Sequence, residues 1–115
     1  MSVIYSDLKD KKVFITGGGS GIGASIVEHF CEQGSKVFFI DINEQSSNKL
    51  VSECKNKKFS VPTFINCDLL NIKFLQNTIS KIISDNGAID ILVNNAANDE
   101  RHSIDEVTEK FWNER

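Results

Sequence analysis

The sequence lacks long hydrophobic runs and an excess of basic residues. Its longest apolar runs are of the size of 37–40, whereas a membrane-spanning helix needs roughly 18 or more apolar residues. The 13 Lys and Arg against 16 Asp and Glu give a net charge of −3, so we expect neither a membrane span nor a nucleic-acid surface. A strand-like segment rather than a signal-peptide core follows the basic stretch 9–12, and we therefore place the protein in the cytoplasm.

Cysteine is sparse and unpaired in sequence. Cys31, Cys54 and Cys67 lie 23 and 13 residues apart, and no CxxC motif is present. This spacing supports neither a zinc site nor a disulfide framework. We expect buried free thiols in a reducing compartment and no metal site.

What the sequence does contain is a regular alternation of two kinds of segment from residue 12 onward. Short β-branched or aromatic runs alternate with longer stretches of helical apolar spacing, which is typical of repeated βα units and a parallel sheet. The single proline, Pro62, indicates an edge strand or a strand that starts there. We predict a Rossmann-like α/β fold with a doubly wound parallel sheet in the order 3-2-1-4. The predicted strands are 13–15, 37–40, 61–65 and 89–93, and the predicted helices are near 21–33, 44–56 and 71–85.

Five of the seven glycines fall within residues 17–23. The cluster follows a predicted strand and opens a predicted helix, which is the context of a dinucleotide-binding loop. Glycines there bring backbone N–H groups close to a pyrophosphate, and the helix N-terminus adds further donors and a positive dipole end. The alternative is a turn that only permits close strand–helix packing. Gly34 and Gly87 each follow a predicted helix, where we expect left-handed caps.

Asp41 ends the second predicted strand, 18 residues beyond Gly23. This is close to the spacing of about 20 at which an acidic residue reaches the adenosine ribose hydroxyls. A carboxylate repels a ribose 2′-phosphate, and neither Ser20 nor residues 42–44 supply a basic partner, so we expect NAD rather than NADP. The alternatives for Asp41 are a solvated carboxylate or the N-cap of the next helix.

Polar residues also follow the third and fourth predicted strands. Asp68 could accept a hydrogen bond from the adenine amine, or it could cap the helix that starts near Asn71. Asn94 and Asn95 could tie neighbouring strands together or present a group to the ribose. The predicted strand order places them at the crevice outside strands 1 and 4, which favours the second role.

Together these motifs resemble the classical short-chain dehydrogenase/reductase family, whose patterns read TGxxxGIG and NNAG. The resemblance rests on residues 16–23, Asp41, the turn 67–69 and residues 94–97, and it extends from Leu8 onward; Ala97 stands where glycine is usual. It implies a cofactor site in which the glycine loop holds the pyrophosphate, Asp41 selects NAD and Asp68 and Leu69 flank the adenine. The cofactor-binding residues expected are Gly17, Ser20, Gly21, Ile22, Gly23, Asp41, Asp68, Leu69, Asn95 and Ala96.

The catalytic groups of that family are not expected in this segment. The resemblance implies a serine, a tyrosine and a lysine downstream of Arg115. Tyr5 and Lys9 fit the YxxxK spacing but precede the first strand, so we reject them. A further helical segment is expected to begin at Ser103 and runs to Arg115 without a stop signal, and the strand 89–93 would be an exposed apolar edge. We therefore interpret residues 1–115 as a single NAD-binding Rossmann segment, the N-terminal part of a longer one-domain enzyme cut before its second half and inactive alone.

Residues 94–102 resemble the corresponding stretch of short-chain enzymes that oxidise sugars such as aldoses or deoxy-hexoses. Asn98, Arg101 and His102 would suit a polyhydroxylated substrate, and a solvated loop is the alternative. His29 lies at the border of an apolar arc formed by Ile22, Ile26 and Phe30, and we expect it to be packed or partly exposed rather than catalytic.

The leading hypothesis is an NAD-dependent oxidoreductase that transfers a hydride between the carbon of a secondary alcohol or sugar hydroxyl and the nicotinamide. The resemblance also implies a homodimer or homotetramer. Two alternatives stay open: a catalytically inactive nucleotide-binding or interaction module, and a 3-oxoacyl thioester reductase, which would be expected to use NADPH.

Overall fold

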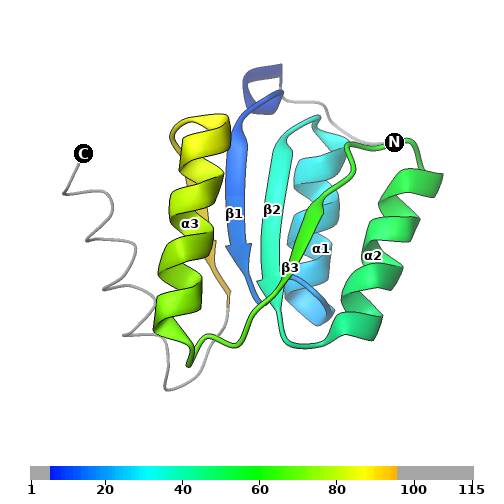
Figure 1. Ribbon diagram of the computed structural model, residues 1–115. Helices are drawn as coiled ribbons and strands as arrows, with labels where there is room; N and C mark the ends of the chain where they lie inside the picture. Colours follow the sequence, from blue (N-terminus) through cyan, green and yellow to red (C-terminus); the bar gives the residue numbers. More distant parts are fainter. Residues whose placement is uncertain (1–5, 96–115) are drawn as a thin grey trace.

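A four-stranded parallel sheet forms the centre of the protein, and helices cover both of its faces (Figure 1). The computed structural model describes residues 6–95. The elements in chain order are the 3-10 helix η1 (Ser6–Leu8), β1 (Lys12–Thr16), α1 (Gly21–Glu32), β2 (Lys36–Asp41), α2 (Glu44–Asn56), β3 (Thr63–Asn66), α3 (Ile72–Asn86) and β4 (Ile91–Asn94). The strands and helices predicted within residues 6–95 are all present, and their bounds differ from the prediction by at most two residues.

The strand order is β3-β2-β1-β4, which confirms the predicted doubly wound arrangement. All three strand pairs are parallel. Pro62 directly precedes β3, the edge strand at one side of the described sheet. A proline is tolerated there because its missing N–H interrupts no ladder.

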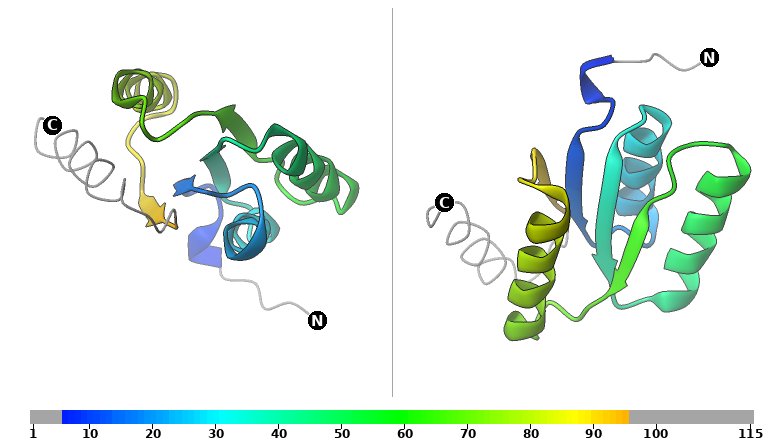
Figure 2. Two further views of the ribbon diagram at one scale, coloured as in Figure 1. Left: turned by 90° about the horizontal axis from the view of Figure 1, so that it is seen from below. Right: turned by 45° about the horizontal axis from the view of Figure 1, so that its top comes forward.

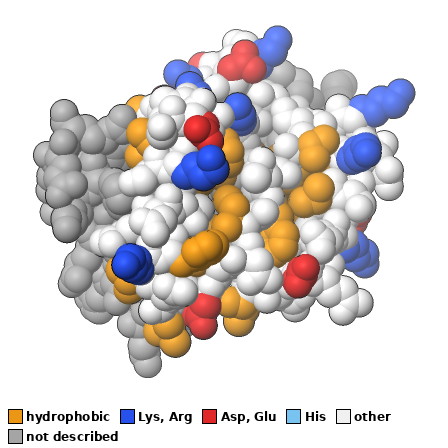
Figure 3. Space-filling view, in the orientation of Figure 1, with side chains coloured by type: hydrophobic (Ala, Val, Ile, Leu, Met, Phe, Trp, Pro, Cys, Tyr) orange, Lys and Arg blue, Asp and Glu red, His pale blue; other side chains and the backbone are white. Residues whose placement is uncertain are grey.

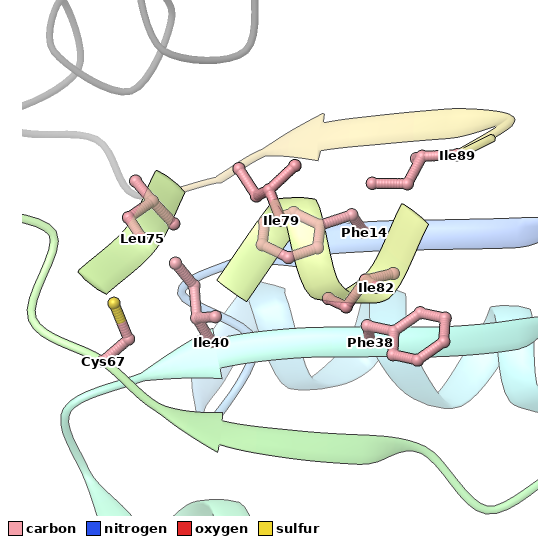
Figure 4. Packing of buried hydrophobic residues seen from close by; sticks show 8 residues of the cluster. All are labelled: Phe14, Phe38, Ile40, Cys67, Leu75, Ile79, Ile82 and Ile89. Atoms are coloured by element: carbon pink, nitrogen blue, oxygen red, sulfur yellow. The ribbon is translucent and has the colours of Figure 1, made fainter. Parts of the chain in front are cut away.

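The two faces of the sheet bury different side chains, because successive residues of a strand point to opposite sides. Phe14, Phe38 and Ile40 pack against α3, which lies on the face of the sheet opposite α1 and α2 (Figure 2). Figure 4 shows this cluster, to which α3 contributes three buried residues, Leu75, Ile79 and Ile82. The opposite face packs against α1 and α2 through Val13, Ile15, Val37 and Phe39. Both faces are apolar, as expected for covered parallel strands.

The buried face of α1 differs from the predicted arc. Gly23, Val27 and Cys31 are buried, whereas Ile22 is 75% exposed. The reason is the close approach of Gly23 to the loop after β1: a Cβ at Gly23 would overlap the carbonyl oxygen of Gly17. The glycine therefore determines how the helix is rotated, and the larger residues Ile26 and Phe30 pack at the margin.

The two predicted glycine caps have different outcomes. Gly34 has φ 84°, and its N–H and that of Ser35 donate to the carbonyls of Cys31 and Phe30 at 3.1 Å, which is a Schellman motif. Gly87 also has positive φ, but its ψ of −172° is extended rather than left-handed helical. The α3 helix is closed instead by the bond from Gly87 N to Ile83 O at 2.8 Å, after which the chain turns toward β4.

No helix within residues 6–95 combines the length and apolar character that crossing a bilayer requires. A groove of about 360 Å³ lies beside α3 and is lined by Phe38, Ile65, Phe74 and Ile82, among others. Figure 3 shows hydrophobic side chains gathered on this face. The groove also includes Thr63 at the start of β3 and Asn86 at the end of α3, so it extends away from the strand ends described next.

Candidate functional site

The candidate site lies where the parallel strands end, at the lower edge of the sheet in Figure 1. The register pairs Thr16 of β1 with Asn94 of β4, and Asp41 of β2 with Asn66 of β3. Because all strands run the same way, their polar last residues gather at one edge. The glycine loop leaves β1 at this edge and leads into α1.

The glycine loop is fixed by its own backbone. The N–H groups of Gly17 and Gly18 donate to the Ile40 carbonyl at 2.9 and 3.3 Å, which holds the loop against β2. Gly17 has φ 66°, a conformation that costs a residue with a Cβ roughly 1–2 kcal/mol. Side chains are excluded at Gly23 for a steric reason, because a Cβ there would also lie 2.7 Å from Asn95 Nδ2.

The N-terminus of α1 has no side-chain cap. Ser20 is the N-cap residue in extended conformation, with φ −157°, and its hydroxyl makes no capping hydrogen bond. The first N–H groups of a helix have no partner within the helix. With the positive end of the helix dipole, they form a site that favours an anion such as a pyrophosphate.

Asp41 is tethered at the end of β2. Its Oδ2 accepts a hydrogen bond from Gly19 N at 2.9 Å, and its Oδ1 accepts one from Asn43 N at 2.8 Å. The N-cap alternative was wrong, because Asn43 caps α2 by accepting from Ser46 N at 3.0 Å. Asp41 is only partly exposed, so it is not a freely solvated carboxylate either. Each of its oxygens has lone pairs beyond the one these bonds use.

Thr16 connects the two asparagines to β1. Its hydroxyl donates to Asn94 Oδ1 at 3.0 Å and accepts from Asn95 N at 3.0 Å. Asn95 Nδ2 also donates to the Gly17 carbonyl at 3.1 Å. The first alternative for the asparagines, that they tie neighbouring strands together, is therefore confirmed, and a contact of Asn95 with a ribose stays a prediction.

The turn after β3 also differs from one prediction. Asp68 does not cap α3: its Oδ1 accepts from Leu70 N at 2.9 Å, and Asn71 is the cap, accepting from Phe74 N at 3.1 Å. Leu69 packs against the α3 cluster. Cys67 is buried in the same cluster (Figure 4); burial raises the pKa of its thiol, and the neighbouring Asp68 carboxylate raises it further. The adenine contact of Asp68 stays a prediction.

Ser47 is a residue that the motif analysis missed. Its side chain is fully buried, and its hydroxyl has no hydrogen-bond partner in the described part of the chain. A Cβ at Gly19 would overlap this hydroxyl and lie 2.9 Å from the Asp41 carboxyl carbon. The hydroxyl of the neighbouring Ser46 also has no partner in the described part of the chain, and an unsatisfied buried hydroxyl costs about 1–3 kcal/mol. Only the tertiary structure could reveal it, because Ser47 lies in a helix without a motif.

A basic side chain that sequence reasoning also missed lies close to the loop. Lys49 of α2 lines a cavity of about 340 Å³ between α1 and α2, together with Gly19 and Ser20. Glu28 and Glu53 line the same cavity, so it carries both signs of charge. The residues near Asp41 in sequence, Ser20 and 42–44, include no basic side chain, whereas the packing of α2 brings Lys49 close to the loop.

Several predicted residues lie outside the described range 6–95. These are Ala96, Asn98, Arg101 and His102, as well as Tyr5 and the helix expected from Ser103. His29 is exposed on α1. Within residues 6–95, no group of three or more His, Cys, Asp or Glu side chains could hold a metal ion.

Comparison with known proteins agrees with this geometry. The profile of the short chain dehydrogenase family matches residues 11–115. A D-xylose 1-dehydrogenase of Caulobacter vibrioides is 43% identical over 114 residues, which cover 99% of this chain and 44% of the relative. A probable galactose dehydrogenase of Rhizobium meliloti is 41% identical over 110 residues, covering 96% and 43%.

Solved structures show the same fold. A hydroxysteroid dehydrogenase from Escherichia coli superimposes with a TM-score of 0.70 at 35% sequence identity, over 79% of this chain and 38% of that protein. The chain thus spans less than half the length of the relatives that it matches.

Proposed function

The chain belongs to the short-chain dehydrogenase family, and on that premise we propose that it forms the NAD-binding part of an oxidoreductase acting on a sugar hydroxyl. Residues 1–115 form a single Rossmann segment in this proposal, and the catalytic serine, tyrosine and lysine follow Arg115. The protein acts as a homodimer or homotetramer in the cytoplasm.

The residues at the strand ends fit a dinucleotide. The loop excludes side chains at Gly23, and the uncapped start of α1 provides N–H groups for the pyrophosphate. The exposed side chain of Ile22 stands at this helix start, and exposed Ile42 directly follows Asp41; both offer apolar surface for the rings of the cofactor. When bound, the nicotinamide provides the hydride acceptor or donor. The residues of this chain supply binding and orientation.

The observation that carries the NAD assignment is the position of Asp41. Its carboxylate is tied to Gly19 N and Asn43 N, so it stays at the end of β2 with lone pairs available to the ribose hydroxyls. A 2′-phosphate would meet this negative charge. Lys49 is the one observation that favours NADP, and the two glutamates in its cavity oppose that effect.

The test replaces Asp41 by asparagine in the full-length protein and measures the Kd of NAD and of NADP by calorimetry. We expect the NAD affinity to fall by roughly tenfold, equivalent to about 1.4 kcal/mol. The ratio of the NADP Kd to the NAD Kd should become smaller. The matched control is Asp90→Asn, since Asp90 also accepts a backbone hydrogen bond, from Lys12 N at 2.8 Å, at the opposite edge of the sheet. An Asp41→Asn variant with unchanged NAD preference would overturn the assignment.

The sugar assignment rests on the relatives and on residues 98–102, and a substrate panel tests it. We expect NAD reduction with aldoses such as D-xylose or D-galactose, and losses on replacing Asn98, Arg101 or His102 by alanine. Oxidation of NADPH by a 3-oxoacyl thioester in place of sugar turnover would support the reductase alternative. Cofactor binding without any turnover would support the inactive module.

A further inference from the structure

Asn86 and Gly87, which join the end of α3 to the segment before β4, form the only Asn-Gly pair in residues 1–115. Asparagine loses its side-chain nitrogen most readily in such pairs, because glycine has no Cβ to hinder the attack of its backbone nitrogen on the neighbouring carboxamide. Asn86 is half-buried and Gly87 is exposed, so water reaches both residues. The reaction open to this pair is therefore deamidation of Asn86.

Each reacting group of the pair has a hydrogen-bond partner. Gly87 N, the nucleophile, donates to the Ile83 carbonyl at 2.8 Å. Nδ2 of Asn86, which leaves as ammonia, donates to the Ile82 carbonyl at 3.0 Å. Oδ1 of Asn86 accepts a hydrogen bond of 2.5 Å from Nζ of Lys36, the first residue of β2. The three bonds hold the pair between α3 and the sheet.

The same bonds keep the nucleophile and the carboxamide apart. The bond from Nδ2 to the carbonyl four residues earlier directs the Asn86 side chain back along α3, in the direction usual for helical side chains. Gly87 follows Asn86 with φ 87° and turns the chain away from the helix. Attack on the carboxamide requires Asn86 to leave its helical conformation, so the last turn of α3 has to open first. Helix ends open more readily than the centre of a fold.

Lys36 ties this turn to the sheet. The bonds to Ile82 and Ile83 lie within α3 and are lost together when its last turn opens, whereas the bond from Lys36 comes from β2, 50 residues away in sequence. A hydrogen bond with a charged donor is stronger than a neutral one. We propose that Asn86 is a deamidation site that becomes reactive only when the last turn of α3 opens, and that Lys36 limits this opening.

The reaction consumes one water and releases one ammonia. Hydroxide removes the proton from Gly87 N, which attacks Cγ of Asn86. The Cγ–Nδ2 bond breaks, and the nitrogen takes a proton from water and leaves as ammonia, so that a cyclic succinimide remains. Water then opens the ring at one of its two carbonyls and produces aspartate or isoaspartate. No electrons are transferred, and water is the only co-reactant.

Both products change the end of α3. A carboxylate at position 86 has no donor for the Ile82 carbonyl, and its charge meets the negative end of the helix dipole. Isoaspartate also adds a methylene group to the backbone that leads to Ile89, which is buried in the cluster against α3. Lys36 begins β2 and Asp41 ends it, so the deamidation site lies at the opposite edge of the sheet from the cofactor site and does not depend on it.

The test incubates the full-length protein in mildly alkaline buffer, both folded and in guanidinium chloride. Peptide mass spectrometry and methylation by an isoaspartate methyltransferase follow the reaction at Asn86. We expect Asn86 to react at least about tenfold more slowly in the folded protein, the factor that corresponds to an opening of about 1.4 kcal/mol. A folded protein that reacts as fast as the unfolded chain, or an Asn86 that stays intact in guanidinium chloride, would overturn the proposal.

Three lysine variants test the role of Lys36. In the folded protein, Lys36→Met should raise the rate by about fivefold, the factor that corresponds to a hydrogen bond of about 1 kcal/mol. Lys36→Arg keeps a charged donor and should react at the wild-type rate. The matched control Lys73→Met removes an exposed lysine from the first turn of the same helix and should leave the rate unchanged.

The unfolded chains provide the reference for these variants. In guanidinium chloride all four proteins should react at the same rate, because the hydrogen bonds are absent there. An unchanged rate in folded Lys36→Met would show that Lys36 does not limit the opening. A slower rate would show that the cation activates the carboxamide instead, and either result would overturn the proposal.

Discussion

Replacement of Thr16 by valine tests how the candidate site is held together. Thr16 is fully buried at the end of β1, and its hydroxyl donates to Asn94 Oδ1 and accepts from Asn95 N. Valine keeps the shape of the side chain and puts a methyl group in place of the hydroxyl. The substitution thus removes both bonds and leaves packing nearly unchanged.

The magnitude follows from the two groups that lose a partner. A buried polar group left without its hydrogen bond costs about 1–3 kcal/mol. Asn94 and Asn95 are half-buried, so water compensates part of this loss, and we expect Thr16→Val to lower the free energy of unfolding by about 2 kcal/mol in total. Thr16→Ser keeps the hydroxyl and removes one buried methyl group, which costs about 0.8 kcal/mol.

Urea denaturation of the full-length protein measures these differences, and NAD titration reads out the site. Because Asn95 also holds the Gly17 carbonyl, we expect the valine variant to bind NAD more weakly than the serine variant. A valine variant as stable as the serine variant, with equal NAD affinity, would refute the role given to the hydroxyl.

Three further predictions concern the helix ends, the loop and the thiols. Lys58 follows α2 with φ 61°, in the position that Gly34 occupies after α1. In urea denaturation, Lys58→Gly should therefore stabilise the protein by about 0.5–1 kcal/mol, and Gly34→Ala should destabilise it by about 1 kcal/mol. A loss of stability in Lys58→Gly would contradict this reasoning. Gly23→Ala should abolish NAD binding in calorimetry, because the added methyl meets the Gly17 backbone rather than a flexible side chain; retained affinity would show that the loop adjusts. The raised pKa values of Cys31 and Cys54 keep both thiols protonated in the folded protein above pH 9.0. Their contribution to the free energy of unfolding is therefore complete below that pH. Above it, the free energy of unfolding should fall by at most about 1.4 kcal/mol per pH unit for each thiol. Chemical denaturation of the wild type at a series of pH values should show this decrease, and the decrease should be shallower in Cys54→Ala. Equal slopes in the two proteins would argue against the raised pKa of Cys54.

The helix caps show which local features can be inferred from sequence alone. Asn43 and Asn71 lie directly before their helices and accept from the N–H three residues on, yet the aspartates two and three residues earlier were equally plausible caps. Asp41 and Asp68 bond instead to the N–H two residues ahead. Neighbouring acceptors compete for the same few donors, and the backbone path after each strand decides which of them reaches the first helical turn.

The rotation of α1 shows a similar limit. Apolar spacing predicted the helix but not its buried face, since Ile22 is exposed and Gly23 is buried. Periodicity weighs residues by hydrophobicity and gives a glycine no weight. The contact between Gly23 and the Gly17 carbonyl is a steric constraint from a different part of the chain.

The sequence by itself determined the alternation of strands and helices, because this depends on local periodicity. It also determined the order of the strands in the sheet and the location of the glycine loop and Asp41 at one edge, because these follow from the rules of parallel βα connections. Only the tertiary structure decided which polar groups meet. The tether from Asp41 to Gly19 and the Thr16 bridge to the two asparagines join residues from separate elements. The packing of α2 buries the Ser47 hydroxyl, which has no partner among the described residues. Such contacts depend on how strands and helices pack to within a few tenths of an ångström, which no spacing along the chain encodes.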